Sequence, residues 1–237
     1  MNVESLGFVN HNEMILIIVF SILFALLTIG ELFFAFIEAD KARKIVKPFL
    51  MFVATLLCLF LFPMQPFLYL GCFFGLLGDI CFIFKDKKAC VYLGLLTFGL
   101  NHLFYIMEMI SILTYKGLMH QNHYIIFSLV GFVFAVCMFF AIRLVIKAEI
   151  PLALGGCLYM TILFMDLGFN ILMVSSGLSL MWYGVAGMIL FIISDSFLTY
   201  TMFIKDVKRR DFYIMASYLA AQVLFLFGII SLLSSSL

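Results

Sequence analysis

Charged residues are scarce in this sequence. Asp, Glu, Lys and Arg make up only 11% of its 237 residues, against roughly 25% in soluble domains. With 66% hydrophobic residues, the chain does not have enough polar side chains to cover a soluble fold. It also has no polar linker and no low-complexity tract. These absences exclude an ordinary soluble enzyme and predict a single transmembrane domain, residues 1–237, whose solvent is lipid.

Paired cysteine motifs are also missing. The six cysteines form no CxxC pair, and each lies in or at the edge of an apolar run. This placement favours small buried side chains over a disulfide framework or a zinc site. We therefore expect no metal and no cofactor. Nucleic-acid binding is not expected either, because the basic residues lie in short loops that membrane topology explains.

Long apolar runs dominate what is present. A helix that crosses a bilayer needs about 20 apolar residues. Eight segments approach or exceed this length: 14–37, 45–62, 66–84, 89–113, 124–146, 150–174, 180–204 and 212–233. The second is short, and Lys47-Pro48 near its start predicts a proline in the first helical turn. The sequence thus predicts an all-α polytopic membrane bundle of about eight transmembrane helices.

The basic residues predict the orientation of this bundle. Of the 14 Lys and Arg residues, 13 lie in or beside the first, third, fifth and seventh connections, and only Lys116 lies on the other side. Basic loops stay in the cytoplasm, so both termini are expected on the non-cytoplasmic side. The host membrane would be the plasma or inner membrane in a bacterium and the endoplasmic reticulum in a eukaryote.

Six ionisable residues fall inside the predicted spans. They are Glu31, Asp79, His102, Glu108, Asp166 and Asp195. A charge near the bilayer centre costs at least about 2.5–3.5 kcal/mol, so such residues are functional candidates. The sequence places no Lys or Arg deep enough to neutralise them. The carboxylates are therefore expected to stay protonated, share protons, find hydrogen-bond donors or hold a cation.

Three of these acids have simple structural explanations. Glu108 lies near the outer end of its span and can reach the interface. Glu31 can make a structural hydrogen bond or have a functional role. Asp166, with Asn170 one turn later on the same face, can join two helices or take part in chemistry.

The other three residues are distinguished by their depth, and a polar pocket in the inner half of the membrane could bring them together. Measured from the cytoplasmic ends, Asp79 lies roughly 9 Å deep, Asp195 roughly 15 Å and His102 roughly 20 Å. The two aspartates end similar sequences, LLGD at 76–79 and IISD at 192–195, through either duplication or chance. Polar or small residues at nearby positions are Asn101, Tyr105, Ser194, Tyr218 and Gln222. We expect these groups to share one polar pocket.

At these positions the chain resembles the YhhN family of membrane proteins, whose characterised members are lysoplasmalogenases. The resemblance covers nearly the whole chain. It is carried by Lys47-Pro48, Gly78-Asp79, GLNH at 99–102 with Tyr105, Tyr159, LFIISDSFL at 190–198, and Tyr218 with Gln222. Two departures are Met165, one residue closer to Tyr159 than in the family, and Asn101, where a small or apolar residue is expected and substrate preference could change.

The resemblance implies hydrolysis of the vinyl-ether bond of a lysoplasmalogen. The products would be a fatty aldehyde and glycerophosphoethanolamine or glycerophosphocholine. The partners would then be a lysophospholipid substrate and the surrounding membrane lipid.

Vinyl-ether cleavage requires a protonated acid and an ionised carboxylate, as glycosidases do. We predict Asp79 and Asp195 as this pair, without assigning which is the acid. His102 could orient water, relay a proton or keep one aspartate ionised. Support by hydrogen bonding is expected from Asn101, Tyr105, Ser194, Tyr218 and Gln222. Lys47 could meet the lipid phosphate or could simply anchor the topology.

Three other functions remain open at this point. Intramembrane carboxylates also form proton relays, so the chain could be a proton-coupled transporter, although no pair of broken helices marks a midplane site. A metal-dependent hydrolase could use His102 with both aspartates, although one histidine with carboxylates is a poor zinc site. A non-catalytic lipid-binding bundle would bind lysolipid and release no product.

Overall fold

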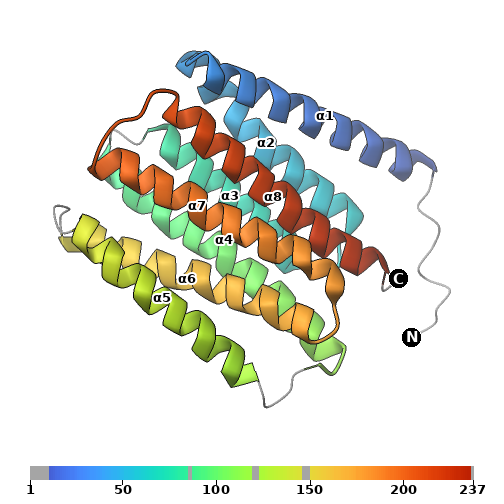
Figure 1. The fold of residues 1–237 in the computed structure, drawn as a ribbon. Helices are drawn as coiled ribbons and strands as arrows, with labels where there is room; N and C mark the ends of the chain where they lie inside the picture. Colours follow the sequence, from blue (N-terminus) through green and yellow to red (C-terminus); the bar gives the residue numbers. More distant parts are fainter. Residues whose placement is uncertain (1–10, 85–86, 119–122, 146–149, 236–237) are drawn as a thin grey trace.

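The computed structural model describes residues 11–84, 87–118, 123–145 and 150–235 (Figure 1). Its helices are α1 His11–Phe36, α2 Asp40–Leu61, α3 Pro66–Ile83, α4 Lys88–Tyr115, α5 His123–Val145, α6 Ile150–Ser175, α7 Trp182–Phe203 and α8 Arg210–Ser235. A 3-10 turn, Ser179–Met181, leads into α7. The described part contains no strand, so the predicted all-α class is confirmed.

Seven of the eight described helices are long and apolar enough to cross a membrane. In α5 the apolar helical stretch found among the described residues, Ile125–Met138, is shorter than these seven. The predicted polytopic bundle is thus confirmed. The orientation of the termini stays a prediction, although α1 begins and α8 ends at the same end of the bundle (Figure 1).

The second helix differs from its predicted start. It begins at Asp40, five residues earlier than expected, so Pro48 lies inside the helix. The prediction of a first-turn proline is therefore wrong. The preceding residues are mostly Lys, Arg and Ala, which favour helix despite their charge. Pro48 has no backbone N–H and leaves the carbonyl of Lys44 without its helical partner.

Helices that follow one another in the chain pack side by side. This holds from α1 to α4 and again from α5 to α8, and the two halves meet where α4 packs on α6 and α1 on α8. Glycines allow the closest approaches. An added Cβ at Gly187 of α7 would lie 2.8 Å from the backbone oxygen of Ala221 on α8. On α3, Gly71 leaves room for the ring of Tyr105 on α4.

The outer surface of the bundle is apolar, unlike that of a soluble protein. Large apolar side chains such as Ile18, Leu26 and Phe33 of α1 are exposed on the outside. The interior is packed mainly with apolar side chains. Among the described residues, ten polar or charged ones are buried within it: Glu31, Asp79, Asn101, His102, Glu108, Asp166, Asn170, Ser194, Thr201 and Gln222. An apolar exterior is what lipid as a solvent requires.

Candidate functional site

Asp79 on α3 is buried and has a cationic partner. The Lys47 ammonium of α2 lies 3.1 Å from Asp79 Oδ1, and the Tyr218 hydroxyl of α8 donates to Oδ2 over 3.0 Å. The expectation that no basic residue reaches the buried acids is therefore wrong. Lys47 reaches inward because its long apolar stem can carry the ammonium well away from the backbone.

Glu31 on α1 is also paired. Its buried Oε1 lies 3.1 Å from Arg43 Nε, and a second guanidinium nitrogen of Arg43 lies 2.7 Å from Asp211 Oδ2. Arg43 belongs to α2, so this one side chain connects α1, α2 and α8. The pairing explains Glu31 as a structural residue.

Asp195 on α7 has different surroundings. The Tyr159 hydroxyl of α6 donates a hydrogen bond to its Oδ2. Within the part of the chain that the structure describes, no Lys or Arg lies within ion-pair distance of this carboxylate. Asp195 is also partly exposed, whereas Asp79 is buried. The two aspartates are thus held by a neutral phenol in one case and by an ammonium and a phenol in the other.

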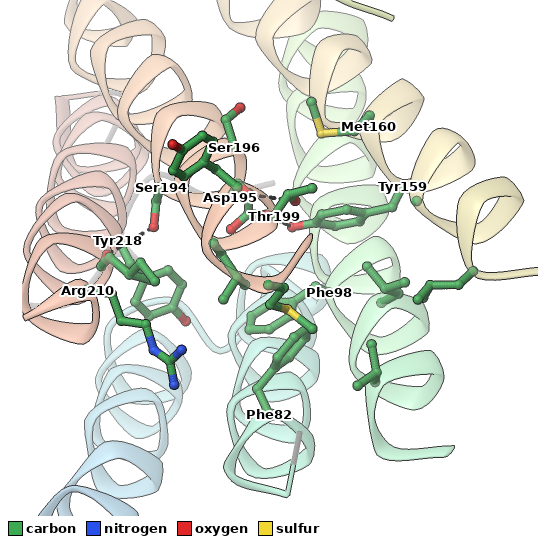
Figure 2. A pocket seen from close by; sticks show the side chains of 18 of the residues that line it. Phe82, Phe98, Tyr159, Met160, Ser194, Asp195, Ser196, Thr199, Arg210 and Tyr218 are labelled. Carbon is green, nitrogen blue, oxygen red and sulfur yellow. Dashed lines mark hydrogen bonds between the residues drawn. The ribbon is translucent and has the colours of Figure 1, made fainter. Parts of the chain in front are cut away.

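Both aspartates line one cavity of about 950 Å³. One wall, from α2 and α8, carries the charged residues Arg43, Lys44, Lys47, Arg210 and Asp211. The opposite wall, from α4, α5 and α6, is mainly apolar: Val91, Leu95, Phe98, Met138, Leu152, Ala153, Leu154, Gly156, Cys157 and Met160. Figure 2 shows Asp195 between Arg210 and Tyr218 on one side and Tyr159 and Met160 on the other. The cavity therefore has a charged side, an apolar side and carboxylates between them.

The predicted site residues divide into two groups. Those that line the cavity are Lys47, Asp79, Ser194, Asp195 and Tyr218. Those that the structure describes outside the cavity lining are Asn101, His102, Tyr105 and Gln222. The chemical roles of both groups stay predictions.

His102 lies behind the cavity wall. Its Nδ1 is 2.7 Å from Asp166 Oδ2, and Asn170 donates to Asp166 Oδ1 over 2.8 Å. The imidazole packs edge-on against Phe191 with ring centroids 4.5 Å apart, and its centroid lies 6.4 Å from that of Tyr159. Asp166 therefore joins α6 to α4 through His102. Of these two ring neighbours, Tyr159 lines the cavity and Phe191 does not.

Three of the four remaining predicted residues connect helices. Asn101 donates to the Gly71 carbonyl over 2.6 Å and so connects α4 to α3. Tyr105 lies beside Cys72, with the hydroxyl 3.3 Å from Sγ. Ser194 donates to the Ile214 carbonyl over 2.9 Å, which joins α7 to α8 although Ser194 also lines the cavity. Gln222 is buried one turn after Tyr218.

Glu108 does not reach the interface as expected. Its side chain is fully buried and faces the backbone of Leu68, in the first turn of α3. A helix N-terminus carries partial positive charge and favours a nearby carboxylate. Glu108 therefore lies inside the protein near this helix end, and within the described residues its two carboxyl oxygens have no hydrogen-bond partner of good geometry.

The described residues contain no group of three His, Cys, Asp or Glu side chains that could hold a metal ion. The set considered for a metal-dependent hydrolase was His102 with the two aspartates. In the structure His102 is bonded to Asp166 instead. The donor set for that alternative therefore does not come together in this arrangement.

Sequence reasoning did not select three cavity residues that matter for the geometry. Tyr159 was noted only as a landmark of the family resemblance, although a phenol in mid-span signals a buried hydrogen bond. Lys44 was counted only among the basic residues of a loop. Gly156 has no signal in the sequence, because only the packing around it makes it distinctive.

Comparison with known families gives one match. The family model described as the YhhN family matches residues 42–229. This range runs from the start of α2 into α8 and includes both aspartates, Lys47, Tyr159 and Tyr218. No curated protein and no solved structure matches the chain.

Proposed function

Because this chain belongs to the YhhN family, whose characterised members are lysoplasmalogenases, we propose that it hydrolyses the vinyl-ether bond of lysoplasmalogens. The products are a fatty aldehyde and a glycerophosphodiester such as glycerophosphoethanolamine or glycerophosphocholine. The reaction class is inferred from the family, and the way in which this chain carries it out is inferred from the residues that line the cavity.

The observation that carries the proposal is the division of the cavity into charged and apolar walls with two carboxylates between them. A lysolipid has the same division, with a charged head, a single hydrocarbon chain and the vinyl ether where the two join. With its head against α2 and α8 and its chain against α4, α5 and α6, the vinyl ether lies beside the aspartates. The cavity volume of about 950 Å³ is also near the upper end for small-molecule sites.

We infer the roles of the two aspartates from their different partners. The ammonium of Lys47 stabilises the ionised form of Asp79. Asp195 has a neutral phenol as its partner, which leaves Oδ1 free to carry a proton. We therefore take Asp195 as the acid and Asp79 as the base.

The reaction begins with proton transfer from Asp195 to the vinyl carbon that is not bonded to oxygen. The other vinyl carbon becomes an oxocarbenium centre, which the Asp79 carboxylate stabilises electrostatically. Water then attacks that centre while Asp79 accepts one of its protons. The product of this step is a hemiacetal, with Asp195 ionised and Asp79 protonated.

Collapse of the hemiacetal restores the starting state. Asp79 returns its proton to the glycerol oxygen as the carbon–oxygen bond breaks. Asp195 takes the proton of the hemiacetal hydroxyl as the aldehyde forms. One water is consumed, and both carboxyl groups regain their initial protonation.

The lipid phosphate needs a cation that is not already engaged. Lys47 is bound to Asp79, and Arg43 is bound to Glu31 and Asp211. Lys44 lines the cavity, and among the described residues no carboxylate lies within ion-pair distance of it. We therefore propose Lys44, in place of Lys47, as the contact for the phosphate.

The direct test uses purified protein with a lysoplasmalogen and with its saturated ether analogue. Aldehyde from the vinyl ether and none from the saturated ether is the expected result. Binding of both lipids without aldehyde would contradict the proposal and favour the non-catalytic lipid-binding bundle. Proton-coupled solute uptake by proteoliposomes, with no lipid turnover, would favour a transporter.

A further inference from the structure

Gly156 on α6 is unusual among the glycines of the bundle. Among the described residues, a Cβ added at this position would meet no atom within 4 Å, yet Gly156 is partly buried and lines the cavity. The neighbouring Gly155 has Leu95 3.8 Å from its added Cβ. The space beside Gly156 is therefore part of the cavity and is not filled by a neighbouring helix.

Its position relates this space to the reacting groups. Gly156 precedes Tyr159 by three residues, so the two lie on the same face of α6, about 4.5 Å apart along the helix axis. Tyr159 holds Asp195. The other lining residues of α6 near this position, Ala153, Cys157 and Met160, are apolar. A chain that runs from the aspartates along α6 toward its N-terminal end passes Gly156.

We propose that Gly156 is a specificity-determining residue that admits the hydrocarbon chain of the substrate next to its vinyl ether. A glycine inside a helix lowers helix stability, and here no close helix contact requires it. What its missing side chain leaves is room within the cavity. This inference rests on the proposed function, because it places the substrate by the same two walls.

The test variant is Gly156→Leu, with Gly131→Leu as its control. Gly131 on α5 is the other helical glycine among the described residues whose added Cβ would meet no atom within 4 Å, and it is exposed and outside the cavity lining. Both changes replace a helical glycine by a good helix former. They therefore add the same bulk at one site within the cavity and one site outside it.

For Gly156→Leu we expect the KM for a long-chain lysoplasmalogen to rise about tenfold or more, because each methylene kept from apolar contact costs about fourfold in affinity. The kcat at saturation should change much less. Gly156→Ala should give a smaller rise, and Gly131→Leu none. An analogue whose alkenyl chain has only about four carbons, ending near the three-residue spacing of about 4.5 Å between Tyr159 and Gly156, should be affected least.

Binding separates this inference from the proposed reaction. The affinity of each variant for the saturated ether lysolipid is measured alongside turnover. If the wild-type protein binds this lipid and releases no aldehyde from the vinyl ether, the reaction is refuted, and weaker binding by Gly156→Leu would still support the chain site. Unchanged affinity and KM in Gly156→Leu, or an equal loss in Gly131→Leu, would overturn the inference.

Discussion

The surroundings of Asp79 and Asp195 differ although their local sequences are alike. Each ends a short apolar segment, LLGD on α3 and IISD on α7, and each lines the same cavity. Asp79 is buried with an ammonium and a phenol, whereas Asp195 is partly exposed and has a phenol as its partner. The comparison teaches that the neighbouring helices, more than the local sequence, decide which carboxyl is held ionised.

The largest effect is expected when Asp195 is replaced by a residue that cannot donate a proton to the substrate. In Asp195→Asn the amide cannot protonate the vinyl carbon, so kcat should fall by about 10³-fold or more, at the upper range for a general acid. Aldehyde release by purified protein measures this. Binding of the saturated ether lysolipid should persist, which shows that the variant is folded. Wild-type turnover in Asp195→Asn would remove it as the acid.

The next effect concerns the cation at Asp79. Lys47→Met keeps the apolar stem and leaves a buried carboxylate without its partner, which costs about 3–5 kcal/mol when the charge stays. We expect a lower thermal unfolding temperature together with lost activity. The double variant Lys47→Met, Asp79→Asn should regain much of the stability and none of the activity. If the single variant is as stable as the wild type, the ion pair is unimportant.

Loss of the Tyr159 hydroxyl, which holds Asp195, should lower kcat more than loss of the Tyr218 hydroxyl, which holds Asp79. Asp195 becomes charged as it gives up its proton, and a hydrogen bond to a charged group contributes about 1.5–3 kcal/mol. Tyr159→Phe should therefore lower kcat about 10- to 100-fold. Tyr218→Phe should cost less, because Lys47 still holds Asp79. Steady-state kinetics of both variants on one substrate measure the difference. Equal losses would contradict the different roles that we assign to the aspartates.

The smallest effect is expected at the charged wall. Lys44→Gln should raise KM about fivefold at low salt, since one basic side chain near anionic lipid groups contributes about 1 kcal/mol. The effect should shrink as ionic strength rises. Lys41→Gln is the control, because Lys41 is exposed and outside the cavity lining. If both variants behave alike, Lys44 does not contact the phosphate.

Positions along the membrane normal could be predicted from the sequence, and positions around each helix could not. Depth follows from counting residues at 1.5 Å each, and Asp79 and Asp195, expected roughly 9 and 15 Å from the cytoplasmic ends, do line one cavity. His102 and Gln222 were expected in the same pocket, yet they are buried outside the cavity lining. In a helix that is apolar all round, lipid-facing and protein-facing sides have similar residues, so periodicity does not indicate a face.

The positions of the charged ends of long side chains were also not predicted from the sequence. Lys47 and Arg43 were counted as loop residues because their backbone lies near the membrane edge. Their ammonium and guanidinium groups nonetheless meet Asp79 and Glu31. The early start of α2 at Asp40 was not predicted because the spans were counted from apolar residues, although Lys, Arg and Ala also favour helix.

By itself, the sequence determined that this chain needs lipid around it, that it forms a helix bundle, and where those helices begin and end to within a few residues for all but α2. It could do so because backbone N–H and C=O groups in lipid must find hydrogen-bond partners within the protein, and an apolar segment satisfies this by forming a helix. Only the tertiary structure decided which acid meets a cation, which meets a phenol, and where a cavity remains. Those outcomes depend on contacts between residues far apart in the chain, and packing across several helices sets them.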